Sequence, residues 1–441
     1  MLGKSVREAV LAEVPRDLGF VGVEEPVEEQ WERREQRKAE TDTILQFHQH
    51  YFFTASRTPS AIPTISVRQT VPSGPSVLIA TLVSSSSPTS SPSAVTELRL
   101  DDRTSSSNVL RLAAFYSTGA FTLFDLVLPT SSTAFSFTRL SPPLVSTHSP
   151  TPDPILLARL YSPLLVTVSA AFVLRFWRIG EGIEEAGPRL QSRESWWPVV
   201  LTLQSVVEAA ETEDEWGTKV EATEGREERY KVTLAYSTPI FPSSWSVGVQ
   251  EFLVSIPPSF PSTSKRSRPP RITLTSRHAI ALPRTSPPRD SFPTRATDLV
   301  TSISHADPWI VTSRSDNTLD VYEVVSAPPP PPPSPTQIHL AVIPAASLQV
   351  LHRRTLFGHT GAVESVAIEA GKCVSGGADG RVKVWELGGE GTGLTVLEEG
   401  EAVAGVGGKG GRIRRVWFDE EKIVSVVEGE EGERVRVLRF D

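Results

Sequence analysis

Cysteine is almost absent from this chain of 441 residues, with Cys373 as its single example. One thiol can form neither an intramolecular disulfide nor a cysteine-based zinc site, so we expect a reducing compartment, the cytoplasm or the nucleus. Long uncharged apolar runs are missing as well. Residues 160–174 come nearest, but Pro163 interrupts them and Arg159 and Arg175 flank them. We therefore expect no membrane helix there, and the opening residues lack the apolar core of a secretory signal.

Positive charge is also in deficit, because 44 Lys and Arg face 52 Asp and Glu for a net charge of −8. Nucleic-acid binding depends on clustered Lys and Arg, so the overall balance speaks against a nucleic-acid partner. One local basic cluster occupies residues 265–271 (KRSRPPR). We interpret it as a solvated loop, with a nuclear-import signal or a contact for an acidic partner as alternatives.

Patterns that carry chemistry are weak. The glycine-rich residues 405–411 (GVGGKGG) lack the glycine-to-lysine spacing of a phosphate-binding loop and place Gly410 where Ser or Thr would bind magnesium. His48 and His50 have no set of carboxylates near them at metal-binding spacing. Neither a nucleophile elbow nor a zinc-protease motif occurs. The expectation is a protein without catalytic residues, cofactor or metal.

The amino-acid composition of the chain changes near residue 61. Residues 24–47 are dense in helix formers and charges, so we expect residues 1–60 to form an N-terminal helical arm. From residue 61 to 441, short runs of Val, Ile, Leu, Thr and Phe alternate with Ser, Pro, Gly and Asp, which predicts an all-β domain. Four segments within it are expected to be low-complexity loop insertions, at residues 84–93, 208–228, 257–270 and 328–335. The last is a polyproline run, interpreted as a spacer, with docking on an SH3-like or WW-like groove as the alternative.

The clearest unit is residues 355–387 (TLFGHTGAVESVAIEAGKCVSGGADGRVKVWEL). Gly358-His359 opens it, and strand-like patterns follow at residues 363–368, 372–375 and 381–387. Between the last two strands a tight turn contains Asp379-Gly380, and glycine is the residue that adopts a positive φ at least cost.

This unit closely resembles the WD40 repeat, although Glu386 stands where the family usually has Asp. The resemblance implies one four-stranded propeller blade. It also implies a structural tetrad of hydrogen-bonded side chains, formed by His359, Ser375, Asp379 and Trp385.

One blade cannot bury its own faces, so further blades are expected. In residues 309–324, Thr312, Asp316 and Tyr322 repeat the spacing of Ser375, Asp379 and Trp385, which predicts a partial tetrad without a Gly-His. Weaker units fall at residues 64–100, 110–126, 155–179, 230–255 and 412–440, for about seven in all. We therefore expect a WD40-type β-propeller with seven blades, closed by pairing of the strand at residues 64–68 with the last blade.

The degenerate early units, the repeat second from the end and the closing residues 418–440 are similar to those of fungal F-box/WD-repeat proteins. That resemblance implies a propeller that captures a substrate, and an F-box that links it to a ubiquitin ligase through an adaptor subunit. Residues 1–60 contain no Leu-Pro-led, Leu/Ile-rich module of the F-box type. We expect a non-catalytic scaffold that binds proteins through its faces and loops, with the adaptor as a partner only if an F-box precedes Met1. The alternatives are a scaffold in trafficking, RNA processing or chromatin without a ligase link, and an enzyme built on a propeller.

Overall fold

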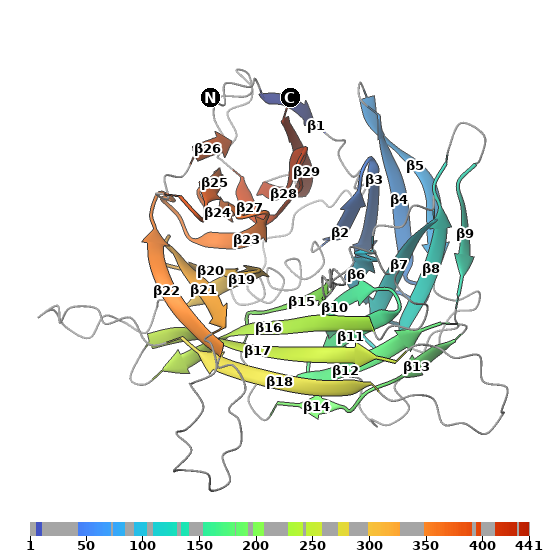
Figure 1. Cartoon of the computed structure of the whole chain (residues 1–441). Coiled ribbons are helices and arrows are strands. Elements are labelled where there is room, and N and C mark those ends of the chain that lie inside the picture. The colour runs from blue at the N-terminus through green and yellow to red at the C-terminus, as the bar shows by residue number, and fades with distance from the viewer. Residues whose placement is uncertain are drawn as a thin grey trace, which may run out of the picture. The chain divides into compact units, whose positions relative to one another are not determined.

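The structure is a computed structural model that describes residues 6–10, 43–71, 74–83, 92–103, 109–129, 134–140, 153–180, 182–192, 197–206, 228–240, 244–257, 272–281, 299–326, 348–389, 394–397, 411–429 and 432–440. Throughout these residues the regular structure is β-strand, and no helix occurs among them. The strands form seven antiparallel sheets, six with four strands and one with five (Figure 1). The expected all-β propeller fold with seven blades is thus confirmed.

The chain divides into two compact units, of which one comprises Val10–Ser195. It contains three of the sheets, in which consecutive strands pair as a meander, except that β14 pairs with β12. The first sheet contains β2 (Thr43–His48), β3 (Tyr51–Ser56), β4 (Thr64–Val71) and β5 (Gly74–Val83). The second contains β6 (Val95–Leu100), β7 (Val109–Tyr116), β8 (Phe121–Val127) and β9 (Ser136–Arg139). The third contains β10 (Ile155–Tyr161), β11 (Leu164–Ser169), β12 (Val173–Ile179), β13 (Ile183–Glu185) and β14 (Leu190–Gln191).

The other unit comprises Met1–Ala9 and Trp196–Asp441 and contains four sheets. Its first sheet is β15 (Val199–Ser205), β16 (Glu228–Ile240), β17 (Ser244–Ile256) and β18 (Thr273–Ile280). The second is β19 (Val300–Ala306), β20 (Trp309–Arg314), β21 (Leu319–Ser326) and β22 (Leu348–Leu356). The third is β23 (Val363–Glu369), β24 (Lys372–Gly377), β25 (Val382–Glu386) and β26 (Leu394–Leu397). The fourth is β27 (Arg412–Phe418), β28 (Lys422–Gly429) and β29 (Gly432–Phe440), with β1 (Val6–Val10) as its outermost strand.

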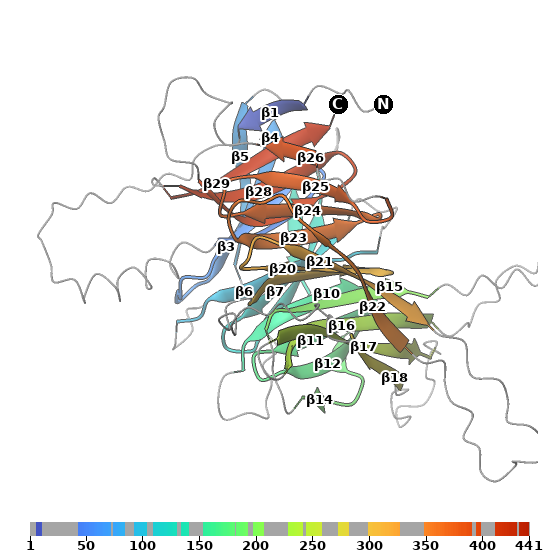
Figure 2. The same ribbon diagram turned by 90° about the vertical axis from the view of Figure 1, so that its left-hand side faces the viewer.

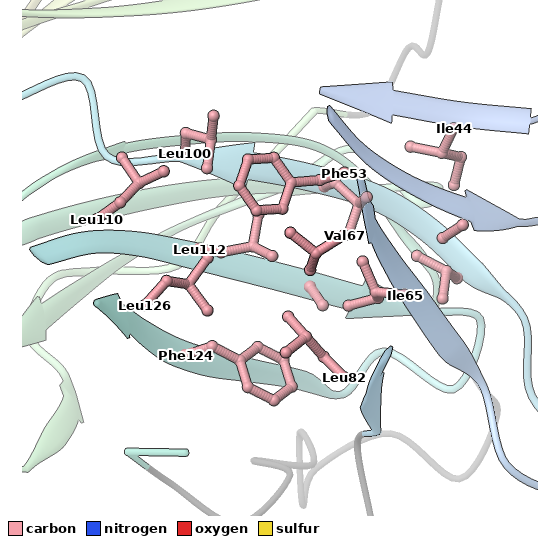
Figure 3. Packing of buried hydrophobic residues seen from close by; sticks show 14 of the residues in the cluster. Ile44, Phe53, Ile65, Val67, Leu82, Leu100, Leu110, Leu112, Phe124 and Leu126 are labelled. Atoms are coloured by element: carbon pink, nitrogen blue, oxygen red, sulfur yellow. The ribbon is translucent and has the colours of Figure 1, made fainter. Parts of the chain in front are cut away.

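Alternating burial explains why these segments form sheets with packed faces. In the first two sheets, side chains of alternate residues form one apolar cluster, including Phe53, Val67 and Leu112 (Figure 3). Each sheet therefore gains its stability from packing against a neighbour, since a single twisted sheet cannot cover its own apolar face.

The last sheet combines the two ends of the chain, but the strand that completes it is not the expected one. The strand β1 pairs with β29, and both views show the two side by side (Figures 1 and 2). The segment at residues 64–68, expected in this role, belongs to β4 and pairs with β3 and β5. Its Ile65 and Val67 are buried in the core of the first sheet, which fixes it there.

The sheets also begin earlier in the chain than the expected boundary at residue 61. Residues 43–56, expected to belong to the helical arm, form β2 and β3, whose Ile44 and Phe53 enter the core. Strands prevail here because Tyr51, Phe52 and Phe53 bury aromatic surface that a solvated helix would expose. Residues 24–42 of the expected helix lie outside the described residues. Residues 84–91, 208–227, 258–270 and 328–335 of the expected insertions do so too, and each of these segments falls between two successive strands.

Candidate functional site

The structure brings His359, Ser375, Asp379 and Trp385 together in one chain of hydrogen bonds. Trp385 Nε1 donates to Ser375 Oγ over 2.8 Å, and His359 Nε2 lies 2.8 Å from the same oxygen. On the other side of the ring, His359 Nδ1 lies 3.0 Å from Asp379 Oδ2. One tautomer satisfies all three contacts: His359 donates from Nδ1 to Asp379 and accepts the Ser375 hydroxyl at Nε2.

Local backbone geometry places these four side chains. Ser375 lies on β24 and Trp385 on β25, while Asp379 occupies the turn between them. Gly380 follows in this turn with a φ of +73°, a conformation that favours glycine. A side chain at Gly377 would contact Asp379 Oδ1 and His359 Nδ1 at less than 3 Å, so only glycine leaves room for the pair.

The electrostatics keep Asp379 ionised. Burial alone would raise the pKa of this carboxyl, but hydrogen bonds from His359 and from the Thr360 and Arg381 backbone amides prevail and lower the pKa to about 2. The Ser–His–Asp order resembles that of a hydrolase, yet the Ser375 side chain is fully buried and its oxygen accepts from an indole. The arrangement therefore stabilises the β24–β25 turn and has no access to a substrate.

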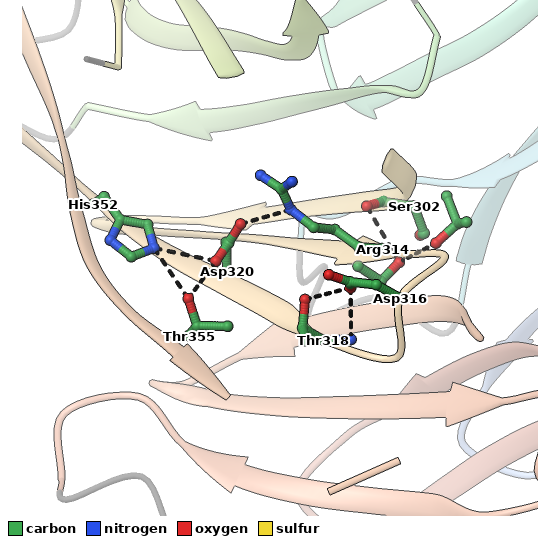
Figure 4. Close-up of polar contacts among 9 residues, drawn as sticks. Ser302, Arg314, Asp316, Thr318, Asp320, His352 and Thr355 are labelled. Atoms are coloured by element: carbon green, nitrogen blue, oxygen red, sulfur yellow. Dashed lines mark hydrogen bonds and ion pairs between the residues drawn. The ribbon is translucent and has the colours of Figure 1, made fainter. Parts of the chain in front are cut away.

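The expected partial tetrad of Thr312, Asp316 and Tyr322 does not assemble in the same way. Thr312 and Tyr322 are buried, on β20 and β21. Asp316, by contrast, is exposed and accepts from the backbone amide and hydroxyl of Thr318 at 3.1 and 2.6 Å (Figure 4). Asp316 thus caps a local turn, and the sequence between β18 and β19 contains no histidine that could take the role of His359.

A different acidic residue organises this sheet. Asp320 is fully buried and lies 2.7 Å from Arg314 Nε; its other oxygen accepts from Thr355 Oγ1 at 2.6 Å and lies 3.1 Å from His352 Nε2 (Figure 4). Burial opposes ionisation of Asp320, but His352, Arg314 and Thr355 outweigh it and hold its pKa below the usual value. Sequence reasoning missed these residues; the one available signal was an Asp at the strand position where residues 372–387 carry Lys383.

The hydroxyl position of the tetrad recurs in two further sheets. On β11, Thr167 Oγ1 accepts from Trp177 Nε1 at 3.0 Å, in the register that joins Ser375 to Trp385. On β28, Ser425 occupies the same register, but the position of the tryptophan is held by Leu438. Within the described residues, the buried Ser425 hydroxyl has no hydrogen-bond partner.

A second charged network links the sheet β15–β18 to the sheet β19–β22. Lys231 Nζ lies 2.5 Å from Asp307 and 3.0 Å from Glu251, and Arg277 pairs with the other oxygen of Glu251. His305 contributes a further contact to Asp307 at 3.1 Å. Burial alone would raise the pKa of Asp307, but its bonds to His305 and Lys231 lower it to about 2. Every charge here has an opposite partner, so the network is structural.

Within the described residues, no group of three or more His, Cys, Asp or Glu is arranged to hold a metal ion. Nor does any helix there have the length and apolarity to cross a membrane.

Seven antiparallel sheets of four or five strands and a His–Ser–Asp–Trp tetrad define the WD40 class of β-propeller. The family model described as the F-box protein pof12 beta-propeller matches residues 34–405. The chain therefore belongs to this family of propellers.

Solved structures similar to the chain share little sequence with it. Sqt1 of Saccharomyces cerevisiae is 9% identical, with a TM-score of 0.45 over 91% of this chain and 97% of that one. The WD40 propeller domain of Doa1 is 11% identical, with a TM-score of 0.40 over 90% and 93%. The computationally designed Ika8 protein is 14% identical, with a TM-score of 0.38 over 91% and 97%. No match was found among the curated proteins.

Proposed function

We propose that this chain is a non-catalytic scaffold that binds other proteins, and that it serves as the substrate-recognition subunit of an SCF-type ubiquitin ligase. The observation that carries the proposal is membership of a propeller family named for an F-box protein, over residues 34–405. The tetrad supports it as well, since Ser375, His359 and Asp379 are committed to fold stability. A propeller used in this way offers its loops and faces to partners.

The ligase link depends on an F-box, which residues 1–60 do not show as a sequence pattern. The test is a pull-down with the purified adaptor subunit of the ligase. We expect the full-length transcript product to retain the adaptor and a fragment that begins at Met1, which keeps β1, not to retain it. If the full-length product fails to retain the adaptor, the ligase role is wrong while the scaffold role stands.

Exposed apolar side chains support a proposed binding surface on the unit that contains β15–β29. Three of these side chains lie in segments that lead into the first strand of a sheet: Trp197 before β15, Leu299 before β19 and Phe357 before β23. The strands β19 and β23 begin at a common end, since the Thr301 hydroxyl near the start of β19 donates to the carbonyl of Val363 at the start of β23. Phe357 is the most exposed of the three, at 70%. Large apolar side chains at such positions are typical binding residues.

A matched pair of variants tests this surface. Phe357→Ser should remove bound proteins from an affinity purification, because a protruding aromatic side chain contributes contact area at little entropic cost. The control is Leu394→Ser on the outermost strand β26, where the exposure is nearly equal at 68%. Quantitative mass spectrometry of both eluates should show loss with the first variant alone; equal recovery would place the binding surface elsewhere.

The absence of an F-box pattern from residues 1–60 favours a second candidate, a scaffold in trafficking, RNA processing or chromatin complexes without a ligase link. For the protein in either role, we propose a location in the cytoplasm, the nucleus or both, since its single cysteine is a buried thiol. The partner list from the same purification separates the candidates. Ligase subunits would support the first, and their replacement by components of another assembly would support the second.

A further inference from the structure

The strand β5 differs from the other outermost strands of the sheets. It has ten residues and is the longest of them; the next are β22 with nine and β18 with eight. Among the described residues it pairs with β4 on one edge, and it ends the order of its sheet (Figure 1). The N–H and C=O groups on its other edge are therefore open to a further strand, apart from Pro75, which has no N–H.

Natural edge strands carry charges that prevent pairing with another chain, and β5 has none. Its sequence is GPSVLIATLV, and no charged residue stands between Arg68 and Glu97. The other long outermost strands follow the rule, with Arg277 in β18 and Arg353 and Arg354 in β22. Of the shorter ones, β26 and β14 lack charge, and they have four and two residues.

The side chains of β5 show a strand that is anchored on one face and open on the other. Leu82 is fully buried, and Ile79 and Ala80 pack against the core of the first two sheets. Leu78 and Val83, which pair with Arg68 and Thr64 on the other face, are 50% and 36% exposed, and Val77, on the core-facing side, is 52% exposed. The strand is thus held in an extended conformation while it presents apolar side chains to solvent, so little ordering entropy opposes addition of another strand.

We propose that β5 is a self-association surface, on which β5 of a second copy of this chain adds as an antiparallel strand. A two-fold axis would then cross the middle of the paired strands and join the two sheets into one. The second copy is the occupant because it supplies what this edge requires: a long uncharged segment already held as a strand, with an open edge of its own. A partner selected by charge would find no countercharge here, since the edge carries none.

The first experiment measures the oligomeric state of the purified full chain by sedimentation velocity over a range of concentrations. We expect a reversible dimer. Leu78→Lys should raise its dissociation constant at least about tenfold, because the two copies would place like charges at one interface. The control is Val109→Lys, because Val109 is 39% exposed but its strand β7 lies between β6 and β8. This variant should leave the dimer intact. A chain that is monomeric at every concentration, or a dimer unaffected by Leu78→Lys, overturns the proposal.

A cysteine scan answers the same question without relying on a lysine variant that folds poorly. Val77→Cys, Leu78→Cys, Thr81→Cys and Val83→Cys are introduced one at a time; the native Cys373 is buried and its raised pKa keeps it protonated. In an antiparallel pair, only the residue nearest the two-fold axis meets its own counterpart within disulfide distance. One position should therefore cross-link much faster than the others under mild oxidation. Equal rates at all four, or ladders of higher oligomers, would contradict a two-fold β5 pair.

Discussion

The sheets β19–β22 and β23–β26 solve the same packing problem with different polar groups. Both carry a buried hydroxyl on the second strand, Thr312 or Ser375, and an aromatic residue on the third, Tyr322 or Trp385. In β23–β26 the remaining partners come from loops, through His359 and Asp379. In β19–β22 they come from strands, through Arg314, Asp320 and His352. A blade can therefore lose its Gly-His and keep a buried polar network, provided that the new acid is paired with a cation.

The largest expected effect comes from removing the ion pair between Arg314 and Asp320 in the sheet β19–β22. Asp320→Ala would leave the Arg314 guanidinium without its carboxylate, and loss of one partner of a buried pair costs about 3 to 5 kcal/mol. Chemical denaturation monitored by circular dichroism measures the change in the free energy of unfolding.

The control for this experiment is Asp316→Ala in the adjacent turn. Its side chain is exposed and accepts hydrogen bonds from Thr318, so we expect a cost of about 0.5 to 1 kcal/mol. Equal losses for the two variants would show that Asp320 has no special role.

The stability of the sheet β23–β26, which contains the tetrad, should depend on pH through the ionisation of Asp379. Its pKa falls from 3.8 to about 2 on folding, so the ionised form stabilises the fold above pH 3.8 and that contribution disappears as the pH drops toward 2. The linked free energy is about 2 kcal/mol. Asp379→Asn should lower stability at pH 7 and flatten its decline between pH 5 and pH 3, measured by denaturation at each pH.

The acid experiment needs a reference, because Asp307 is also held at a pKa of about 2. Asp307→Asn should flatten the same part of the curve, and the double variant should flatten it further, since the two networks share no residue. An Asp379→Asn variant with the slope of the original chain would show that the tetrad does not depress this pKa.

The tetrad was predictable because its members lie close together in sequence. Gly358-His359, Asp379-Gly380 and Trp385 fall within one short repeat that resembles the WD40 repeat, and this resemblance implies the hydrogen bonds. Asp316 has the spacing of Asp379 but not its role. The spacing of the acidic residue indicates where the turn lies. Its role depends on whether a histidine from another loop lies within hydrogen-bond distance, as His359 does for Asp379.

Contacts between distant segments left no comparable mark in the sequence. His352 and Thr355 reach Asp320 from β22, which residues 327–347 separate from β21 in the sequence. Similarly, the pairing of β1 with β29 joins the two ends of the chain. Strand identity follows from local alternation, but the choice of partner strand depends on which pairs bury the most apolar surface, and this is a property of the whole chain.

The smallest expected effect separates Ser375 from Ser425, which occupy the same register on β24 and β28. Ser375→Ala should cost about 1 to 2 kcal/mol, because His359 and Trp385 would each keep a buried polar atom without a partner. Ser425→Ala should be neutral or slightly stabilising, since Leu438 offers its hydroxyl nothing to bind. Parallel denaturation curves of the two variants give the difference directly. Equal costs would mean that the alanine effect arises from packing around the strand rather than from the tetrad, and the comparison between sheets would then rest on Asp320 alone.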